Sequence, residues 1–397
     1  MKRFFQEVGV SVAVFWPLAA FAQAQPLVSQ AALAPAPGSK GSVQLFGLID
    51  VSVGHYLSEG GPRTTAIGNS NRAKSRLGFK GQEDLGQGAW AGFWLEGAVE
   101  AENGNSRAFG FERRSTLSLG GPAGELRLGR DFTPVHLSDA QFDPFNATGV
   151  GTNLMLQVRS SGTGPGRAPI SAGFAANNPV FIRANNAITY LLPPGLGGWS
   201  GRLQVALPNH LPSGEATVGR HVAGRLGYEA GGAAVALAVA HTAAQSGPQG
   251  SSPGAPAASP SPGVQTVTLA GSYALPAWVQ ATVMGELLHE RYRLPDGSRG
   301  SQGLMVGASL PLGRGALKAS LARAVFDLGP TAPLAPTPRV SKWALGYVLP
   351  LAKRFEVYAT VARIRNQGGA RMAVSAWVPG QANAASTGFE LGWSYSF

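Results

Sequence analysis

The side chains in this sequence that could do chemistry are mainly basic ones on the polar faces of predicted β-strands. In the run SRLGFKG at 75–81, Leu77 and Phe79 share one face, so Arg76 and Lys80 share the other, because side chains alternate along a strand. Fixed positive charges gathered on one face attract anions and repel cations. The same alternation groups further basic residues on polar faces: Arg114, Arg127, Arg183, Arg202, Arg225, Lys318 and Lys342.

The overall charge agrees with a basic site. The chain has 32 Lys and Arg residues against 21 Asp and Glu residues, a net charge of +11. Composition alone would suit a nucleic acid, a membrane surface or an anionic solute as partner. Glu96, Glu286 and Glu356 could each pair with an arginine, and an arginine paired in this way would not favour anions over cations. For the set as a whole, the excess of positive charge favours anion selectivity.

No pattern in the sequence indicates an enzyme. The six histidines show no spacing typical of a metal site, and the absence of cysteine removes thiolate ligands. The glycine-rich runs at 120–124 and 195–198 lack the Lys-Ser/Thr ending of a phosphate-binding loop. No serine has a histidine and an acid grouped with it on neighbouring strand faces. We therefore expect no catalytic residues, no cofactor and no metal.

The elements that must carry the basic residues are predicted to be β-strands throughout. From Ser42 onward, alternating runs of about ten residues are separated by Gly, Pro, Asn or Asp, and no stretch has extended helical periodicity. The class is therefore all-β. The sixteen candidate strands cover 43–54, 74–82, 88–100, 109–120, 123–131, 181–192, 198–207, 219–230, 232–243, 264–275, 277–291, 300–313, 315–327, 339–350, 354–366 and 386–397.

The connections between these strands alternate between short and long. Tight turns at one rim and long loops at the other are typical of outer-membrane barrels, with the turns on the periplasmic side. A barrel of sixteen strands is too wide for side chains to fill, so the polar faces would line water and the apolar faces would contact lipid. The long connections cover 55–73, 101–108, 132–180, 208–218, 244–263, 292–299, 328–338 and 367–385.

One connection, 132–180, differs from the others in its length. It carries two acids, Asp139 and Asp143, and many glycines. Loops of this length within a compact fold are uncommon unless they are functional. The loop 244–263 is instead a low-complexity run of Pro, Ser, Ala and Gly, and we expect it to be an external segment.

The two ends of the chain predict export and closure of a barrel. A basic start followed by the apolar run 8–21 is typical of a secretory signal peptide, cleaved after residue 22 or residue 24. The expected organisation is a signal peptide at 1–22, an Ala/Pro-rich lead-in at 23–41 and a barrel at 42–397. The last strand has one bulky apolar face and ends at Phe397 with no turn after it, so in a closed barrel it would pair with the first strand.

Several stretches together resemble the Gram-negative trimeric porins of the anion-selective general type. The stretches that carry the resemblance are SVQLFGLID at 42–50, SRLGFKGQEDLG at 75–86, FERRSTLSL at 111–119, LRLGRD at 126–131, IRANN at 182–186 and the terminal Phe397. The resemblance implies a 16-stranded antiparallel transmembrane β-barrel, assembled as a homotrimer, with its third external loop folded inward as a constriction loop. This chain departs from the pattern in its content of Ala, Gly and Pro and in the insertion at 244–263.

The resemblance also implies an arginine cluster on the wall that faces the constriction loop. Carried over by motif, it would contain Arg76, Arg183 and one of Arg113 and Arg114, with Arg130 at the base of the loop. The family pattern favours Arg113, whereas strict alternation favours Arg114, and a bulge could decide between them. The other expected site residues are Lys80, Arg127 and Arg202, which alternation places on the wall, Asp139 and Asp143 on the loop, and Phe397 for barrel closure and assembly.

The expected function is passive diffusion of small hydrophilic solutes through a water-filled pore in the bacterial outer membrane, with a preference for anions. The alternatives are a solute-specific channel for organic acids or phosphate and, from a different class, an outer-membrane lipase. The expected partners are two further copies of the chain, outer-membrane lipid and lipopolysaccharide, the barrel-assembly machinery and small anionic solutes, with no nucleic acid.

Overall fold

Alternating apolar and small or polar residues build long antiparallel strands along most of the chain. The computed structural model describes residues 42–105, 108–159, 182–210, 216–218, 220–243, 263–276, 279–294, 297–329 and 336–397. The expected signal peptide, the lead-in and residues 244–262 of the Pro/Ser-rich loop lie outside these ranges.

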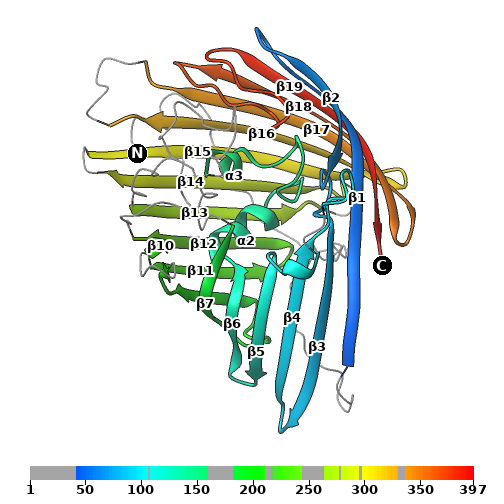
Figure 1. Ribbon diagram of the computed structural model, residues 1–397, viewed down its shortest axis with the longest axis vertical. Coiled ribbons are helices and arrows are strands. Elements are labelled where there is room, and N and C mark those ends of the chain that lie inside the picture. Colours follow the sequence, from blue (N-terminus) through cyan, green and yellow to red (C-terminus); the bar gives the residue numbers. More distant parts are fainter. Residues whose placement is uncertain are drawn as a thin grey trace.

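The strands pair antiparallel in chain order, and the last strand closes on the first (Figure 1). A separate small pair is formed by β9 (Asn209–His210) and β10 (Ala216–Val218). The strands of the barrel are β1 (Ser42–Ser58), β2 (Arg63–Asn69), β3 (Arg76–Gly86), β4 (Ala89–Ala98), β5 (Arg114–Gly121), β6 (Gly124–Phe132), β7 (Arg183–Leu191), β8 (Trp199–Ala206), β11 (His221–Ala230), β12 (Ala233–Thr242), β13 (Gly263–Ala274), β14 (Thr282–Leu294), β15 (Gly297–Leu312), β16 (Gly315–Asp327), β17 (Arg339–Ala352), β18 (Phe355–Gln367) and β19 (Ala385–Ser396).

Two of these elements, β2 and β3, share one position in the barrel. β1 pairs with β2 over Val51–Leu57 and with β3 over Ser42–Leu48. Counted this way, the sheet has sixteen positions, which confirms the predicted all-β barrel of sixteen antiparallel strands. The prediction of a long loop at 55–73 is wrong, because β1 runs on to Ser58 and β2 returns along it. The run RTTAIGN of β2 has too little apolar alternation to be recognised as a strand.

A buried carboxylate holds the bend between β2 and β3. Asp50 accepts hydrogen bonds from the backbone N–H groups of Asn71, Arg72 and Ala73 at 2.9, 3.3 and 3.2 Å. The hydroxyl of Tyr358 donates to the same carboxylate at 2.8 Å. These bonds satisfy backbone groups that the ladder leaves unpaired at the bend. Asp50 therefore fixes the chain where it leaves the sheet.

The two faces of the sheet follow the predicted alternation, with one exception. On β5, Leu117 and Leu119 are exposed on the outer face, whereas Thr116 and Ser118 are buried on the inner face. Along β13 to β18, however, part of the inner face is apolar, where we expected a polar lumen. Buried side chains there pack against loop residues that fill this side of the interior: Val264, Leu288, Phe326, Val340 and Ile364.

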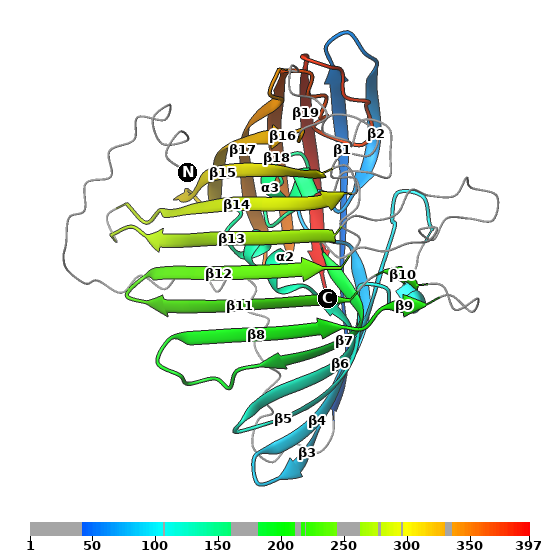
Figure 2. The ribbon, with the colours of Figure 1, turned by 90° about the vertical axis from the view of Figure 1, so that its left-hand side faces the viewer.

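The loop after β6 folds into the barrel and contains two short helices that the sequence did not predict. They are α2 (Pro134–Gln141) and α3 (Leu154–Arg159), and both lie on the inner side of the sheet (Figures 1 and 2). Thr133 caps α2 by accepting a hydrogen bond from the His136 backbone N–H at 3.3 Å. Eight and six residues are too few for helical periodicity to be read in a sequence. No helix of the described residues is long and apolar enough to cross a membrane.

The chain end completes the barrel. β19 pairs with β1 from Ser58↔Ser386 to Leu48↔Ser396. Beyond this, Phe397 and Gly47 exchange two backbone hydrogen bonds of 3.1 Å each. The Phe397 ring lies over Gly47, where a Cβ would clash with it. The last residue is thus paired through both its backbone and its ring.

Candidate functional site

The barrel interior contains a cavity of about 2200 Å³ whose lining is strongly basic. Among the described residues, four acids line it: Glu96, Glu229, Glu356 and Glu390. Ten described Lys and Arg residues line it: Arg72, Lys74, Arg76, Arg113, Arg183, Arg202, Arg225, Lys318, Lys353 and Arg354. The excess of positive charge predicted for the polar strand faces is therefore present on the surface of the cavity.

Two arginines from different elements lie against one carboxylate, and a third arginine lines the same cavity. Arg76 begins β3, Arg113 precedes β5, and Glu96 lies near the end of β4. Glu96 accepts a hydrogen bond from Arg113 Nε at 2.6 Å, and Arg76 Nε lies 4.0 Å from its other oxygen. Arg183, at the start of β7, has its guanidinium carbon 4.5 Å from the centre of the Phe132 ring and forms no ion pair within the described residues. Glu96 thus pairs with two of these three cations.

The structure assigns different surroundings to Arg113 and Arg114. Arg114 is on the inner face of β5, as alternation predicts, but it is buried in the wall and does not line the cavity. Arg113 lines the cavity because it precedes the strand, where the alternation of the ladder does not apply. Both residues of the pair therefore point inward, at different depths.

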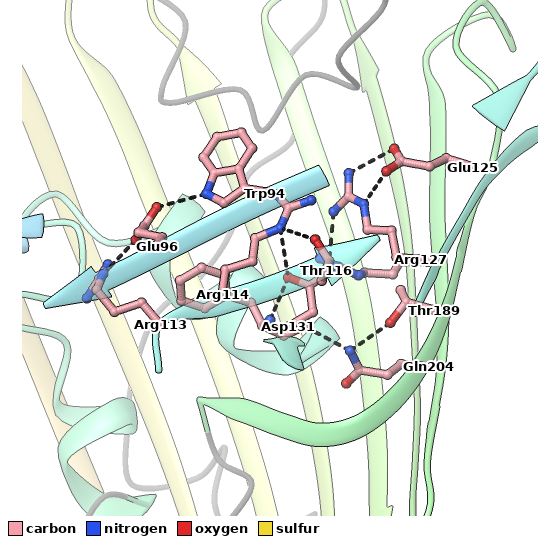
Figure 3. A network of polar contacts seen from close by, with 12 residues as sticks. Trp94, Glu96, Arg113, Arg114, Thr116, Glu125, Arg127, Asp131, Thr189 and Gln204 are labelled. Carbon is pink, nitrogen blue, oxygen red and sulfur yellow. Dashed lines mark hydrogen bonds and ion pairs between the residues drawn. The ribbon is translucent and has the colours of Figure 1, made fainter. Parts of the chain in front are cut away.

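Next to the cavity, a buried network holds three further arginines, of which Arg202 also lines the cavity; Figure 3 shows Arg114, Arg127 and their carboxylate partners. Asp131 is fully buried at the end of β6 and lies between Arg114, Arg127 and Arg202. The Asp131 carboxylate is 3.8 Å from Arg114 Nε and 3.4 Å from Arg127 Nη1, and it accepts a direct hydrogen bond from Arg202. Arg127 also pairs with Glu125 through two hydrogen bonds. Arg114 packs on the ring of Trp94 at 4.5 Å.

Five of the sequence-predicted basic residues do not line the cavity: Lys80, Arg114, Arg127, Arg130 and Lys342. Arg130 lies where β6 and β7 shift register, and its side chain bonds the Glu112 carbonyl and Asn185. Lys80 faces inward, but its ammonium group lies over the rings of Phe46 and Trp94, 5.6 and 5.1 Å from their centres. The bulge redirects the Arg130 side chain, and contact with the aromatic rings holds that of Lys80.

The two acids of the inward loop are structural. Asp139 is fully buried and pairs with Arg159, which joins α2 to α3. Asp143 accepts hydrogen bonds from the backbone N–H groups of Phe145, Ala147 and Asn153 at 2.9, 2.8 and 2.8 Å. Neither lines the cavity. The loop therefore adds no carboxylate opposite the arginines from these two positions.

His136 on α2 lines the cavity beside the arginine cluster. Its ring stacks on Phe132, with the ring centres 5.5 Å apart and the planes at 17°. Burial, together with the positive charges of Arg183 and Arg159, holds the pKa of His136 well below its ordinary value of 6.5. The imidazole is thus neutral and adds no charge to the cluster near neutral pH. Within the described residues, no three potential ligands are grouped as a metal site would require.

Sequence reasoning missed four cavity-lining cations, Arg72, Lys74, Lys353 and Arg354, and the buried carboxylate that supports the wall. Lys74 and Arg72 lie in the bend between β2 and β3. Lys74 lies two residues before Arg76, so strand alternation would have predicted that both side chains face inward. Asp131 had no such signal, because only the assembled sheet brings its three arginines together.

We predict that replacing Asp131 with asparagine strongly destabilises the barrel. The change would leave three buried guanidinium groups with too little negative charge, and removing one partner of a buried pair typically costs about 3–5 kcal/mol. Urea unfolding of the detergent-refolded protein, followed by tryptophan fluorescence, measures this loss. Glu83→Gln, at an exposed carboxylate of β3, is the matched control. Equal stability of the two variants would contradict the assigned role of Asp131.

We also predict that His136 makes the protein less stable in acid. Since its pKa is lower in the folded state than the ordinary 6.5, the unfolded chain binds a proton below that pH while the folded chain does not. Stability then falls as the pH drops below 6.5, by at most about 1.4 kcal/mol per pH unit from this group. His136→Gln should remove that part of the slope in unfolding free energy against pH. Identical slopes for the two proteins would rule this out.

Comparison with known proteins places these features in one family. A family model described as Gram-negative porin matches residues 9–369. Outer membrane porin protein 32 of Delftia acidovorans is 32% identical over 370 residues, which cover 90% of this chain and 95% of that protein. An outer membrane porin protein of Bordetella pertussis is 30% identical over 180 residues, covering 41% of this chain and 42% of that protein.

Solved structures show the same architecture. An anion-selective porin from Comamonas acidovorans has a TM-score of 0.70 and 29% identity, covering 90% of this chain and all of that one. OmpT of Vibrio cholerae in its trimer form, 13% identical with a TM-score of 0.60 and covering 90% of this chain and all of that one, shares the fold. The family consists of outer-membrane channels, which confirms the predicted location and the prediction that the chain is not an enzyme. The chain belongs to the Gram-negative porin family and is an outer-membrane porin.

Proposed function

We propose that the pore passes small hydrophilic solutes by passive diffusion and prefers anions. The observation that carries this proposal is the lining of the cavity, with ten basic residues against four acids. The relative from Comamonas acidovorans, described as anion-selective, supports it. Charges beside a low-dielectric wall act over a narrow aqueous path with little screening, so the excess of cations attracts anions into the pore.

The arginine cluster of Arg76, Arg113 and Arg183 is the proposed selectivity element. Glu96 neutralises part of the charge of Arg113 and Arg76, whereas Arg183 stays uncompensated by any ion pair of the described residues. Asp131 and Glu125 balance the buried arginines behind the cluster, so these serve the wall more than the pore. Selectivity should therefore depend on Arg113 and Arg183 more than on Arg114 or Arg127.

We further propose the organisation and partners that the sequence implies. Residues 1–22 act as the signal peptide and 23–41 as the lead-in to the barrel. The chain assembles as a homotrimer, in line with the trimer form of the Vibrio cholerae relative. Its outer face contacts membrane lipid and lipopolysaccharide, and the barrel-assembly machinery reads its last strand. Closure of single channels in three equal steps would support the trimer, and a single step would contradict it.

Replacing Arg113 and Arg183 together with glutamine should weaken anion preference. A unit charge about 4 Å from a permeating ion attracts an anion and repels a cation by about 1 kcal/mol each in a watery lumen, so each loss should lower the anion-to-cation permeability ratio by up to roughly thirtyfold. Reversal potentials in planar bilayers under a salt gradient measure that ratio. Arg339→Gln, exposed at the start of β17, is the control for a lost charge outside the lumen. Cation preference of the parent protein would refute the proposal. Saturation of conductance by one organic acid or by phosphate would favour a solute-specific channel.

Deletion of Phe397 should impair assembly more than conductance. The deletion removes the two backbone hydrogen bonds to Gly47 and the ring over that glycine, at the seam that closes the barrel. The fraction of chain that reaches the heat-modifiable folded form in the outer membrane should fall, while the channels that do form should conduct as the parent does. Assembly at the parental level without Phe397 would refute this role.

A further inference from the structure

The inward loop, taken here as residues 133–159, touches the barrel wall at residues that have no side chain. Gly303 and Gly307 on β15, Gly346 on β17 and Gly388 on β19 are all buried on the inner face. We call these four residues the wall glycines. None of them has a positive φ, so their backbone conformation is open to any residue. The reason for glycine must therefore be space.

Each wall glycine lies directly under a side chain of the inward loop. A Cβ built on Gly307 would lie 2.5 Å from Pro144 Cγ, and one on Gly346 would lie 2.9 Å from Phe145 Cε1. On Gly388 it would lie 2.7 Å from Val150 Cγ1, and on Gly303 it would overlap the Met155 sulfur. Carbon atoms in good contact are about 3.5–4.0 Å apart. Alanine at any of these positions therefore requires the loop or the wall to move.

The loop side chains cannot simply turn away. Phe145, Val150 and Met155 are buried in one hydrophobic cluster with residues of the wall. Rotation of any of them would displace packed neighbours, since protein interiors contain few voids. The added atom would therefore push on the loop as a body.

Polar contacts hold the loop against the same part of the wall. Lys342 Nζ on β17 donates to the Thr152 carbonyl at 2.6 Å and to the Gln157 side chain at 2.8 Å. Glu390 on β19 accepts a hydrogen bond from the Val150 backbone N–H at 3.0 Å, and Glu286 on β14 accepts one from Asn153. These bonds draw the loop toward the wall. The wall glycines set how close it can come.

The opposite side of the same loop lines the pore. Residues between and beside the contacts with the wall glycines face the cavity: Asn146, Ala147, Thr148, Thr152, Leu156 and Gln157. The loop is thus a thin layer between wall and pore. Any shift away from the wall moves it into the permeation path.

We propose that the four wall glycines are positioning residues that set the width of the pore by fixing how deeply the inward loop sits against β15, β17 and β19. They touch no permeating solute and carry no charge. Conductance measures the width of the pore and reversal potential measures its anion preference. The role of the wall glycines and the anion preference can therefore be tested independently.

Single-channel conductance of Gly303→Ala and Gly346→Ala tests the proposal. Both variants should conduct less than the parent while their reversal potential under a salt gradient stays unchanged. Gly285→Ala on β14, on the outer face between the buried Met284 and Glu286, is the control for a glycine-to-alanine change in a strand, because its Cβ would meet the Met305 carbonyl oxygen only at 3.6 Å, an ordinary contact. Heat-modifiable mobility in electrophoresis verifies that each variant is folded. If Gly346→Ala fails to fold beside the Phe145 ring, Gly303→Ala still tests the proposal, because the nearest atoms to its Cβ are side-chain atoms of the buried Met155 and the wall lies no closer than the Arg323 carbonyl oxygen at 3.4 Å.

A compensating change separates positioning from general damage. Met155→Ala removes the sulfur and methyl atoms that a Cβ on Gly303 would meet, and the next neighbour is then the Arg323 carbonyl oxygen at 3.4 Å. The double variant Gly303→Ala/Met155→Ala should conduct as Met155→Ala alone does, which a double-mutant cycle detects. Parental conductance of the folded single variants would overturn the proposal. So would a loss in Gly303→Ala that Met155→Ala does not restore.

Discussion

The pairing of every strand edge is the constraint on which the rest of the structure depends. Backbone groups in the hydrocarbon layer have no water to bond, so a sheet that crosses a membrane must close on itself. Here β1 and β19 close it along a ladder from Ser58↔Ser386 to Leu48↔Ser396. Sixteen positions give an interior that side chains alone cannot fill. What fills it instead, loop or water, then decides what the protein does.

The interior combines two solutions to that problem. On the β13 to β19 side, the inward loop brings its own apolar residues and converts the inner wall into a packed core. On the β3 to β8 side, the wall faces an open cavity and carries arginines. A polar residue on the inner face of a strand therefore does not always contact water. An apolar residue on that face does not mean that the barrel lacks a water-filled pore.

The arginines themselves differ in how completely they are compensated. Those around Asp131 are buried, and a charge in such a place is stable only when it is paired and hydrogen-bonded. Those around Glu96 lie at the cavity surface, where water lowers the cost of an unpaired cation. The same residue type thus supports the wall in one layer and faces the solute in the next. Their compensation separates the two roles better than their depth does, since Arg113 is also buried and Arg202 also lines the cavity.

Much of this was predictable from the sequence, because strand alternation is a local property. The sixteen strands and the inward direction of Arg114, Arg127 and Arg202 follow from it directly. The position of Arg113 depends on where β5 begins, and that of Arg130 on a bulge, neither of which the pattern records. The strand β2 and the two helices depend on contacts such as the Asp50 carboxylate and the Thr133 cap.

The bend between β2 and β3 has a consequence for how this barrel can change. Since β1 holds the register of β2 and of β3 separately, the segment between them bears no part of the ladder. Residues could be inserted or removed there without sliding any strand against its neighbours. Because Arg72 and Lys74 lie on this segment and face the cavity, the chain has a place where the lining of the pore can diversify while the barrel remains intact.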